Sequence, residues 1–499
     1  MSTLGFGDIT FHTDVGLLFT LWVLISGIVF LLIMLPFTFV QFFYAPWLEA
    51  QEKARTPREL PVGTTGHIIL TSLNPITAKL ARKLAKYDHE YVIIEADVQR
   101  ALELHDMGFK VVVGAADEPK TYERLRIHDA AMVVATNDDL MNTNISFTVR
   151  EITAKVPIVN SATEEHSVDI LEFPGNTHVF QFLKMLGVAM GQRILGVDMG
   201  TNVIGRFGKL LIVEAPVMRT PIEGKSLDQI RLREETGMTV VGLWEHGKFR
   251  VPDLLEKIGP TVVLVLAGSE EQLAKYDEHF SISCANYAID APVCILGAGR
   301  VGHVVAQTLA AKEIDYIFVE KDAGAYEHIG EKCIHGDAAD INTLKRAGIE
   351  KARSVIVTTH DDAMNIYLTF YCRKLRPDIQ VISRATEEKT VSKLHRAGAD
   401  VVVSYASMGA NAILNFLQPD DVSVFTEGLD VFSRSVHSAI VGKRLSDGRI
   451  RELTGCSVIA INRGGEQMVS PDPQIYLREN DELILIGRAD SQKHYTENF

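Results

Sequence analysis

The chain has 499 residues, of which 46% are hydrophobic and 23% charged, which is enough to bury several cores and predicts about three domains at roughly 100 to 200 residues each. Lys and Arg number 50 against 64 Asp and Glu, so the formal net charge is −14. We expect no nucleic-acid partner, because such a partner requires a basic stripe that displaces counterions from phosphate. The five cysteines are far apart and form no CxxC pair, which argues against a disulfide framework or zinc site and favours a reduced cytosolic setting.

The chain opens with MSTLGFGD, in which two glycines flank an aromatic residue. Glycines at this spacing let a backbone aim successive carbonyl groups at one axis, and four such strands can replace the water shell of K+. The string stands directly before an apolar stretch, which makes this role chemically specific. The predicted ligands are the carbonyl groups of residues 3 to 6 and the Thr3 hydroxyl, within a predicted ion-selectivity filter of Thr3, Leu4, Gly5, Phe6, Gly7 and Asp8.

No charged residue occurs from Val15 to Leu48, and about 20 apolar helical residues suffice to cross the hydrocarbon layer. One transmembrane helix is therefore predicted. The alternatives are a buried core helix and a signal peptide, but the start of the chain lacks the basic residues of a signal peptide. Lys53, Arg55 and Arg58 follow the stretch, so the positive-inside rule places the C-terminal side in the cytoplasm.

Gly27 lies in the middle of this predicted helix. A glycine there costs about 1 kcal/mol relative to alanine and permits bending. It is interpreted either as a gating hinge or as a small residue that lets two helices pack closely.

The remaining residues repeat themselves. The segment GAADEPKTYERLRIHDAAMVVATNDD and a later SATEE match GDAADINTLKRAGIEKARSVIVTTHDD and RATEE, with an offset of 223 residues between Asp138 and Asp361 and between Glu164 and Glu387. A smaller pattern, GKSL with a later TG, recurs as GKRL with TG at an offset of 218. The chain is therefore predicted to be a duplicated two-part unit behind a membrane segment.

In the larger part of each unit, short β-branched runs alternate with helical patterns. In the second copy PVCILG predicts a buried strand, VGHVVAQTLAAKEI an amphipathic helix, and IFVE, VIVTT, VISRA and VVVSY further strands. This alternation predicts an α/β fold with a parallel, doubly wound sheet. The smaller parts, with runs such as LLIVEAP and TVVLVLAG, predict compact α+β modules.

A dinucleotide-binding fingerprint stands between a predicted strand and helix of the second copy. Gly297, Gly299 and Gly302 form a GxGxxG pattern, and Glu320 ends the next strand. The glycines allow a tight turn and close approach to a pyrophosphate, whose charge is favoured at the helix N-terminus. Glu320 can accept hydrogen bonds from ribose hydroxyls and repels a 2′-phosphate, which favours NAD(H) or an adenine nucleotide over NADP(H). The alternative is a tight turn without a ligand.

The first copy carries TSLNPI at the corresponding position, so all three glycines are replaced. Leu73 is expected where the backbone would approach phosphate, and Ser161 matches Arg384 of the second copy. We therefore expect the first copy to keep the fold and to have lost the nucleotide site. Neither copy contains an arrangement typical of catalysis, and we expect that the protein is not an enzyme.

The filter string with the following helix resembles the filter and inner helix of potassium channels, and the repeated units resemble tandem regulator-of-K+-conductance (RCK) domains. Each such domain has a Rossmann-like N-lobe and a small C-lobe, of the TrkA-N and TrkA-C type found in potassium-uptake regulators. The resemblance rests on the filter string, GxGRxG, VEKD and GDA. It implies a plasma-membrane homotetramer with a cytoplasmic ring of eight RCK units, and adds as nucleotide contacts Arg300, Asp337, Ala338, Thr359 and Arg384.

The resemblance also implies a domain organisation. The expected parts are 1–48 (filter and inner pore helix), 49–65 (linker), 66–195 (first N-lobe, degenerate), 200–282 (first C-lobe), 290–418 (second N-lobe, nucleotide-binding) and 422–499 (second C-lobe). Channels of this family have an outer helix and a pore helix before the filter. We therefore expect this chain to be a piece of a longer protein; a remnant that does not conduct alone is the alternative.

The function predicted from the sequence is a K+-conducting channel subunit gated by a nucleotide, with a divalent cation as a further candidate ligand of unknown site. One alternative is a non-conducting, membrane-anchored regulator of a separate potassium transporter, but the intact filter string argues against a mere anchor. The other is an NAD-dependent oxidoreductase, which would need a catalytic acid or base that the sequence does not identify.

Overall fold

The computed structural model describes residues 11–47, 57–199, 201–217, 220–245, 248–251, 253–259, 262–280, 291–324, 330–417, 422–426, 429–487 and 491–499. The predicted filter, Thr3 to Asp8, lies outside the described residues, as do residues 49–56 of the predicted linker.

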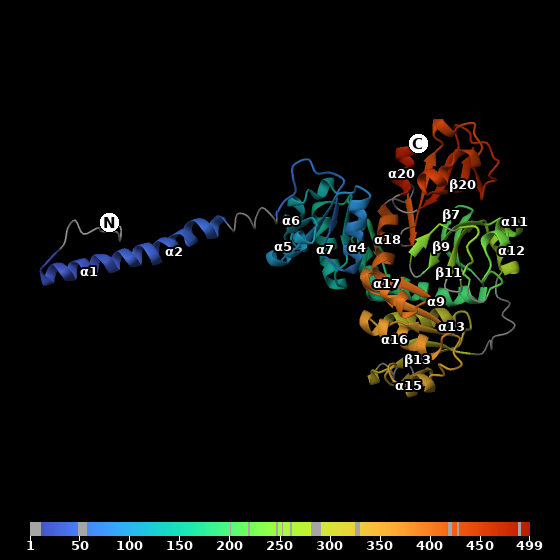
Figure 1. Cartoon of the computed structure of the whole chain (residues 1–499), viewed down its shortest axis with the longest axis horizontal. Coiled ribbons are helices and arrows are strands. Elements are labelled where there is room, and N and C mark those ends of the chain that lie inside the picture. The colour runs from blue at the N-terminus through green and yellow to red at the C-terminus, as the bar shows by residue number, and fades with distance from the viewer. Residues whose placement is uncertain are drawn as a thin grey trace.

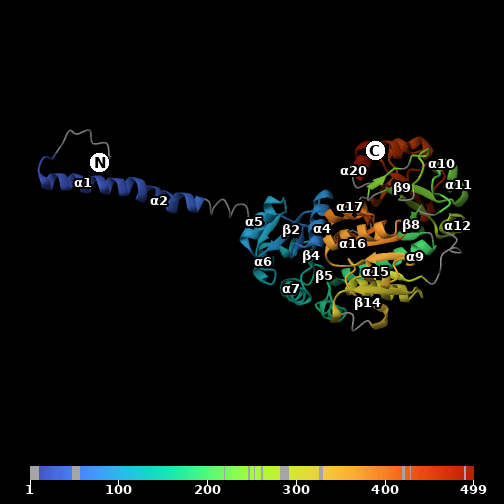
Figure 2. The same cartoon turned by 60° about the horizontal axis from the view of Figure 1, so that its bottom comes forward.

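A single helical run extends from Asp14 to Trp47 and projects away from the rest of the protein (Figures 1 and 2). It is 34 residues long and contains an 18-residue window with a mean hydropathy of 2.7. At about 1.5 Å per residue the run exceeds the roughly 30 Å hydrocarbon core of a membrane. The prediction of one helix long and apolar enough to cross a membrane is confirmed. The run consists of α1 (Asp14–Ile28), the π-helical η1 (Val29–Met34), α2 (Leu35–Phe39) and the π-helical η2 (Val40–Tyr44).

Gly27 lies in α1, two residues before the π-helical η1 begins. Single π-helical turns are points at which long helices bend. The local backbone around Gly27 is therefore compatible with the predicted hinge, which stays a prediction.

The first N-lobe is a parallel sheet of order β3-β2-β1-β4-β5-β6. Its strands are β1 (Ile68–Leu70), β2 (Tyr91–Glu95), β3 (Val111–Val113), β4 (Met132–Ala135), β5 (Ile158–Ser161) and β6 (Thr177–Phe180). Its helices are α4 (Pro75–Lys86), α5 (Val98–Asp106), α6 (Pro119–Arg124), α7 (Asp139–Ile152), α8 (Val168–Glu172) and α9 (Phe182–Met199). Side chains that alternate along the strands fill separate cores on the two faces.

The second N-lobe repeats this topology in the order β14-β13-β12-β15-β16-β17. Its strands are β12 (Val293–Leu296), β13 (Tyr316–Glu320), β14 (Cys333–His335), β15 (Ser354–Val357), β16 (Gln380–Ala385) and β17 (Val401–Ser404). Its described helices are α13 (Arg300–Ala310), α15 (Ile341–Arg346), α16 (Asp362–Leu375), α17 (Glu388–Ala397) and α18 (Tyr405–Leu417). Both N-lobes therefore have the doubly wound order in which a ligand crevice forms where the strand order reverses.

The two C-lobes contain antiparallel five-stranded sheets. The first consists of β7 (Asn202–Phe207), β8 (Leu210–Pro216), β9 (Thr239–Glu245), β10 (Lys248–Arg250) and β11 (Val262–Gly268), with α10 (Leu227–Ile230), α11 (Leu232–Thr236) and α12 (Glu270–Phe280). The second consists of β18 (Val422–Thr426), β19 (Leu429–Ser435), β20 (Ser457–Arg463), β21 (Glu466–Val469) and β22 (Glu482–Gly487), with α19 (Ile450–Thr454) and α20 (Ser491–Asn498). The expected α/β class, with two Rossmann-like lobes and two small α+β lobes, is confirmed.

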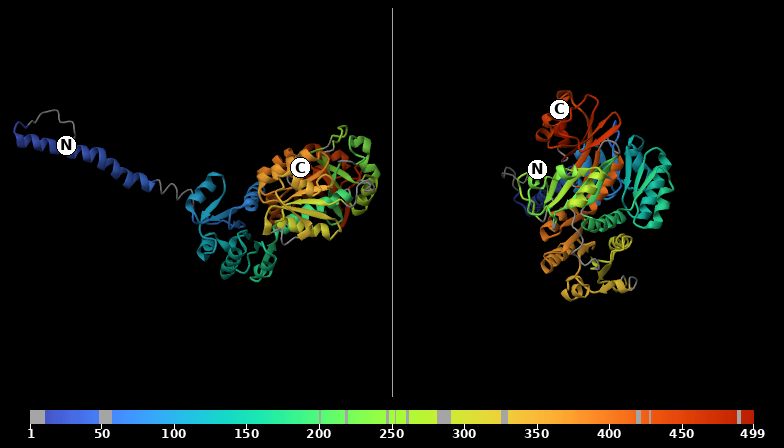
Figure 3. Two further views of the ribbon diagram at one scale, coloured as in Figure 1. Left: turned by 90° about the horizontal axis from the view of Figure 1, so that it is seen from below. Right: turned by 90° about the vertical axis from the view of Figure 1, so that its right-hand side faces the viewer.

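The last helix of each N-lobe packs on the other N-lobe. Helix α9 lies along α13, and α18 lies along α4 (Figures 1 and 3). A Cβ atom on Gly187 or Gly191 of α9 would lie within 2.8 Å of Val304 or Thr308 of α13, so these glycines allow the helices to approach closely. The N-lobes are thus joined by exchanged helices, a feature that the sequence prediction did not contain.

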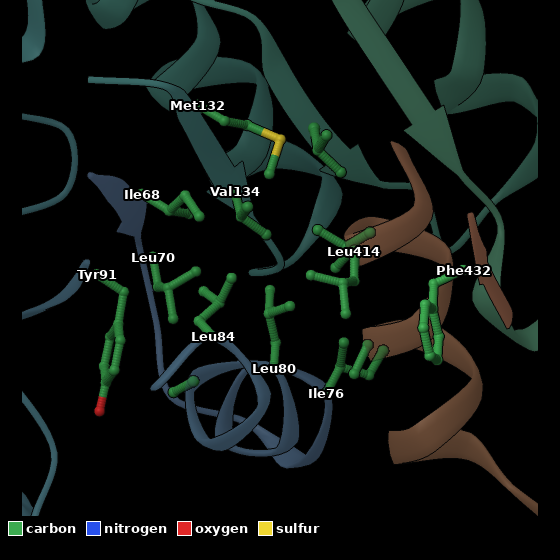
Figure 4. Packing of buried hydrophobic residues seen from close by; sticks show 14 of the residues in the cluster. Ile68, Leu70, Ile76, Leu80, Leu84, Tyr91, Met132, Val134, Leu414 and Phe432 are labelled. Atoms are coloured by element: carbon green, nitrogen blue, oxygen red, sulfur yellow. The ribbon is translucent and has the colours of Figure 1, made fainter. Parts of the chain in front are cut away.

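The exchanged helices build continuous cores. Ile76 and Leu80 of α4 lie beside Leu414 of α18 in one buried cluster that continues to Phe432 of the second C-lobe (Figure 4). The two C-lobe sheets share a further core, in which Ile212 and Ile484 are among the buried residues. Because these cores cross the lobe boundaries, motion of one lobe displaces side chains packed in its neighbours.

Candidate nucleotide-binding site

Two of the three fingerprint glycines are required by the fold itself. Gly297 has a φ of +105°, a conformation that L side chains rarely adopt. A Cβ atom on Gly302 would lie 2.2 Å from the carbonyl oxygen of Gly297. Gly299 differs, because a Cβ atom there would meet no described atom within 4 Å. Packing therefore explains Gly297 and Gly302, whereas open space adjoins Gly299.

Gly299 is the N-cap residue of α13, and no side chain caps this helix within the described structure. The backbone N–H groups of its first turn lack intrahelical acceptors, and the helix dipole makes this end positive. An uncapped N-terminus next to open space is the geometry that accommodates a phosphate.

The first N-lobe closes the same position with its own side chain. Asn74 is the N-cap residue of α4, and its Oδ1 accepts hydrogen bonds from the N–H groups of Ile76 and Thr77, each at 3.0 Å. Pro75, the first helical residue, has no N–H to offer. The structure also corrects the sequence correspondence by one residue, since Asn74 rather than Leu73 occupies the place of Gly299. The loop before α4 is one residue longer than the loop before α13.

Glu320 ends β13 and reaches across to the glycine loop. Its Oε2 accepts a hydrogen bond from the N–H of Ala298 at 2.7 Å, and its Oε1 accepts one from the N–H of Lys321 at 2.8 Å. A carboxylate has about four acceptor positions. The N–H of Asp322 also donates to Oε1, at 3.0 Å. Glu320 can therefore hold the loop and still accept one hydrogen bond from a ribose hydroxyl.

Arg384, near the end of β16, is buried, with only 8% of its surface exposed. Its guanidinium carbon lies 5.9 Å from the centroid of the Tyr405 ring, and its Nε is buried without a hydrogen-bond partner among the described residues. Burial lowers the pKa of Arg384 from its ordinary value, although an arginine side chain stays charged. A buried cation with an unpaired donor is suited to an anionic ligand.

The other predicted contacts follow the ends of neighbouring strands. Thr359 lies against the glycine loop, since a Cβ atom on Gly297 would be 3.4 Å from the Thr359 nitrogen. Asp337 and Ala338 follow β14, where Asp337 Oδ1 accepts from the N–H of Ala339 at 2.8 Å. Arg300, the first residue of α13, extends toward Glu164 of the first N-lobe, and the closest Nη1 to Oε1 distance is 3.6 Å.

Two residues near the carboxyl ends of these strands were missed by the sequence prediction. Thr358 Oγ1 donates to the carbonyl oxygen of Gly297 at 2.8 Å and so supports the glycine turn. Asn365 Nδ2 donates to the carbonyl oxygens of Thr359 and Arg384, at 3.0 and 3.1 Å. Asn365 could have been found from the repeat, because Asn142 occupies its place at the same 223-residue offset.

Comparison with known proteins identifies the lobes. The TrkA-N domain matches residues 68–181 and 293–405, and the TrkA-C domain matches residues 432–499. The chain is 30% identical over 219 residues to "Potassium channel protein 1" of Methanocaldococcus jannaschii, covering 41% of this chain and 66% of that protein. It is 23% identical over 448 residues to a "Trk system potassium uptake protein TrkA homolog" of Archaeoglobus fulgidus, covering 87% and 99%.

Two solved structures resemble the chain closely. A structure described as "GsuK channel bound to NAD" is 36% identical with a TM-score of 0.62, over 99% of this chain and 90% of that chain. A second, "Crystal structure of the GsuK bound to ADP", is 30% identical with a TM-score of 0.53, over 84% and 87%. Together with the duplicated TrkA-N lobes, these matches show that the chain belongs to the family of potassium channels with tandem RCK domains.

Proposed function

We propose that the chain is a subunit of a plasma-membrane channel that conducts K+ and is gated by an adenine nucleotide, NAD(H) or ADP, bound in the second N-lobe. The observation that carries the nucleotide site is the uncapped N-terminus of α13, where Gly299 adjoins open space. The buried, unpaired Nε of Arg384 supports an anionic ligand. The two solved relatives are described as bound to NAD and to ADP.

Each contact has a distinct role in this proposal. The N–H groups at the start of α13 bind phosphate, which Arg300 and Arg384 neutralise. Glu320 accepts one hydrogen bond from a ribose hydroxyl and disfavours a 2′-phosphate by charge repulsion. Asp337, Ala338 and Thr359 line the crevice. The proposed contacts are thus Gly297, Gly299, Arg300, Gly302, Glu320, Asp337, Ala338, Thr359 and Arg384.

Gating requires that the nucleotide bind two states of the cytoplasmic region with unequal affinity. Helices α9 and α18 join the N-lobes, so a change in their relative position is transmitted through packed cores. The linker 49–65 would pass this movement to the membrane helix, which bends at Gly27. K+ passes through the filter formed by Thr3 to Asp8 from four chains.

A flux measurement tests this function. The full-length protein in liposomes is expected to carry K+ but not Na+, and saturating ADP or NAD is expected to change the K+ flux by about fivefold or more, the range of typical coupling free energies. Bound nucleotide without any effect on flux would contradict gating. Nucleotide binding without any K+ flux would instead favour the second candidate, a regulator of a separate transporter, which the near-complete coverage of the TrkA homolog supports.

Exposed apolar side chains support assembly into a ring. On α7 and beside α8 of the first N-lobe, Phe147 is 44% exposed and Phe173 80% exposed. On α16 of the second N-lobe, Phe370 is 56% exposed, and it stands 223 residues after Phe147, at the equivalent position. Unpartnered apolar faces at matching places on both N-lobes fit alternating contacts between chains, as in a homotetramer of eight RCK units.

The combined variant Phe173→Asp and Phe370→Asp is expected to reduce the assembly from four chains to one or two, because each interface would then bury a charge. Particle mass in detergent measures this result. Leu255→Asp is the matched control, since Leu255 is 76% exposed and lies between β10 and β11 of the first C-lobe rather than on an N-lobe. An unchanged tetramer in the combined variant would contradict the proposed interfaces.

A further inference from the structure

The first N-lobe contributes a carboxylate to the proposed nucleotide site of the second. Arg300 is adjacent to the uncapped N-terminus of α13, and its Nη1 lies 3.6 Å from Oε1 of Glu164. Glu164 belongs to the loop between β5 and η4 (Glu165–Ser167) of the first N-lobe. The side chains of Arg300 and Glu164 are 58% and 51% exposed, so both are accessible to a ligand in the crevice.

The loop that carries Glu164 is fixed by a second carboxylate. Asp139 accepts hydrogen bonds from the N–H groups of Thr163 and Glu164, at 2.8 and 3.1 Å. Burial opposes ionisation of Asp139, but hydrogen bonds from Ser167 and this loop outweigh it and lower its pKa. Asp139 therefore stays charged near neutral pH and keeps Glu164 directed toward the neighbouring lobe.

The second copy contains the same loop arrangement, but its contact across lobes comes from the next residue, Glu388, which pairs with Lys79 of α4 at 3.3 Å. Asp362 accepts from the N–H groups of Thr386 and Glu387, at 2.8 and 2.9 Å, as Asp139 does in the first copy. Glu387, however, pairs with Lys389 of its own lobe at 2.9 Å. The duplicated loop thus presents a glutamate in both copies, but only Glu164 faces an arginine at the start of a fingerprint helix.

We propose that Glu164 competes with the nucleotide's phosphate for Arg300, so that nucleotide binding and this contact between the N-lobes oppose each other. The inference rests on the proposed function, because it concerns the same ligand. Phosphate at the N-terminus of α13 would be repelled by Glu164 and attracted by Arg300. By linkage, a contact that weakens nucleotide binding is itself weakened when nucleotide binds.

Removal of the competing charge tests the proposal. The full chain in detergent is titrated with ADP, and Glu164→Gln is expected to tighten binding by about two- to fivefold, the range for a half-exposed ion pair. Glu165→Gln is the matched control. It removes the same charge one residue away, from a side chain that pairs with Lys184 at 2.7 Å and does not contact Arg300. Its ADP affinity is expected to equal that of the wild type.

A double-mutant cycle assigns the effect to Arg300. In an Arg300→Gln background, Glu164→Gln is expected to change ADP affinity by less than half as much, because the shared partner is absent. In about 1 M KCl, where the screening length is about 3 Å, the ratio of variant to wild-type affinity is expected to approach one.

Three outcomes would overturn the competition. These are unchanged or weaker ADP binding by Glu164→Gln, equal tightening by Glu165→Gln, and full additivity with Arg300→Gln. Failure of the proposed function is distinguishable, because folded wild-type protein would then bind neither ADP nor NAD.

Discussion

The Gly299→Asn variant is expected to lose nucleotide binding and to keep its fold. In this variant the new side chain would cap α13 as Asn74 caps α4, by accepting the N–H groups that a phosphate needs. Two charge-assisted hydrogen bonds of about 1.5 kcal/mol or more each would be lost, which weakens ADP binding by about 100-fold or more. Because a Cβ atom at position 299 meets open space, the free energy of unfolding is expected to rise by a few tenths of a kcal/mol.

Titration with ADP and thermal unfolding of the full chain measure the two effects separately. Gly299→Ala adds the Cβ atom without an acceptor and is expected to weaken binding less than Gly299→Asn. Gly302→Ala is the contrasting variant. Its Cβ atom would lie 2.2 Å from a backbone oxygen, so it is expected to lower stability by about 1 to 3 kcal/mol. ADP binding by Gly299→Asn within threefold of the wild type would contradict the assigned phosphate site.

The reciprocal change in the first N-lobe is expected not to restore a site. Asn74→Gly would uncap α4 and would also remove the hydrogen bonds from Asn74 Nδ2 to Thr136, at an expected cost of about 1 to 2 kcal/mol. Pro75 would still lack an N–H, and Ser161 would still stand where the second copy has Arg384. The difference between the lobes thus depends on several residues rather than on the glycines alone.

Much of the architecture could be predicted because it depends on sequence repeats and on the local alternation of strand and helix patterns. The 223-residue offset between Asp138 and Asp361 revealed the duplication, and each aspartate is in fact the N-cap of the corresponding helix, α7 or α16. The alternation of β-branched runs and helices predicted the parallel sheets, because strands buried on both faces require continuous apolar sequence. The difference between the two glycine loops could likewise be predicted, since the positive φ of Gly297 and the close approach at Gly302 restrict these two positions to glycine.

The exchange of α9 and α18 between the N-lobes could not be predicted in this way. An apolar helix face indicates that something covers it, but the pattern does not say which lobe does so. Gly187 and Gly191 in α9 fit against Val304 and Thr308 in α13, and this complementarity exists only in three dimensions. The contact between Glu164 and Arg300 depends on the same exchange, which explains why neither residue's sequence context indicated it.

The backbone conformation of the loops at the nucleotide site could not be predicted from the sequence either. The sequence pattern does not distinguish the three fingerprint glycines from one another. In the structure, Gly297 and Gly302 are required by the backbone conformation and by close packing, whereas Gly299 adjoins open space. Arg384 entered through family resemblance, and its burial with an unpaired Nε supplies a physical reason for a ligand there. Burial of a single polar atom is a tertiary property that no local pattern encodes.

Replacement of Asp481 is expected to have the largest effect on stability. Asp481, with 1% of its surface exposed, receives two hydrogen bonds from Arg463, from Nε to Oδ1 at 2.7 Å and from Nη2 to Oδ2 at 2.6 Å. The N–H of Arg478 donates a third at 2.8 Å. The variant Asp481→Asn keeps the shape but leaves Arg463 without its counter-charge. Because the Arg463 side chain is 21% exposed and keeps some contact with water, the cost is expected to lie at or below the low end of the range for a buried pair, at about 2 to 3 kcal/mol, and the second C-lobe is expected to unfold first.

The pH dependence of the free energy of unfolding measures the contribution of Asp481 independently. Burial alone would raise the pKa of Asp481, but hydrogen bonds from Arg463 and Arg478 outweigh it and lower the pKa below its ordinary value. The stabilisation is therefore fully present above about pH 4, the ordinary pKa of aspartate, and is lost as the pH falls through the lowered pKa of the folded protein. Asp481→Asn is expected to lack this loss, so its stability should fall less steeply on acidification than that of the wild type.

Amide hydrogen exchange of residues 429–487, measured at several pH values, reports both the lower stability of Asp481→Asn and its changed pH dependence within the full chain. Glu479→Gln is the matched control, because Glu479 is an exposed carboxylate two residues before Asp481 in the same loop. It is expected to leave exchange in this lobe unchanged. The combined variant Arg463→Met and Asp481→Leu removes both charges and is expected to recover much of the lost stability, since neither charge is then left buried alone. Wild-type protection in Asp481→Asn would mean that water replaces the carboxylate at Arg463 and that the pair contributes little to the lobe.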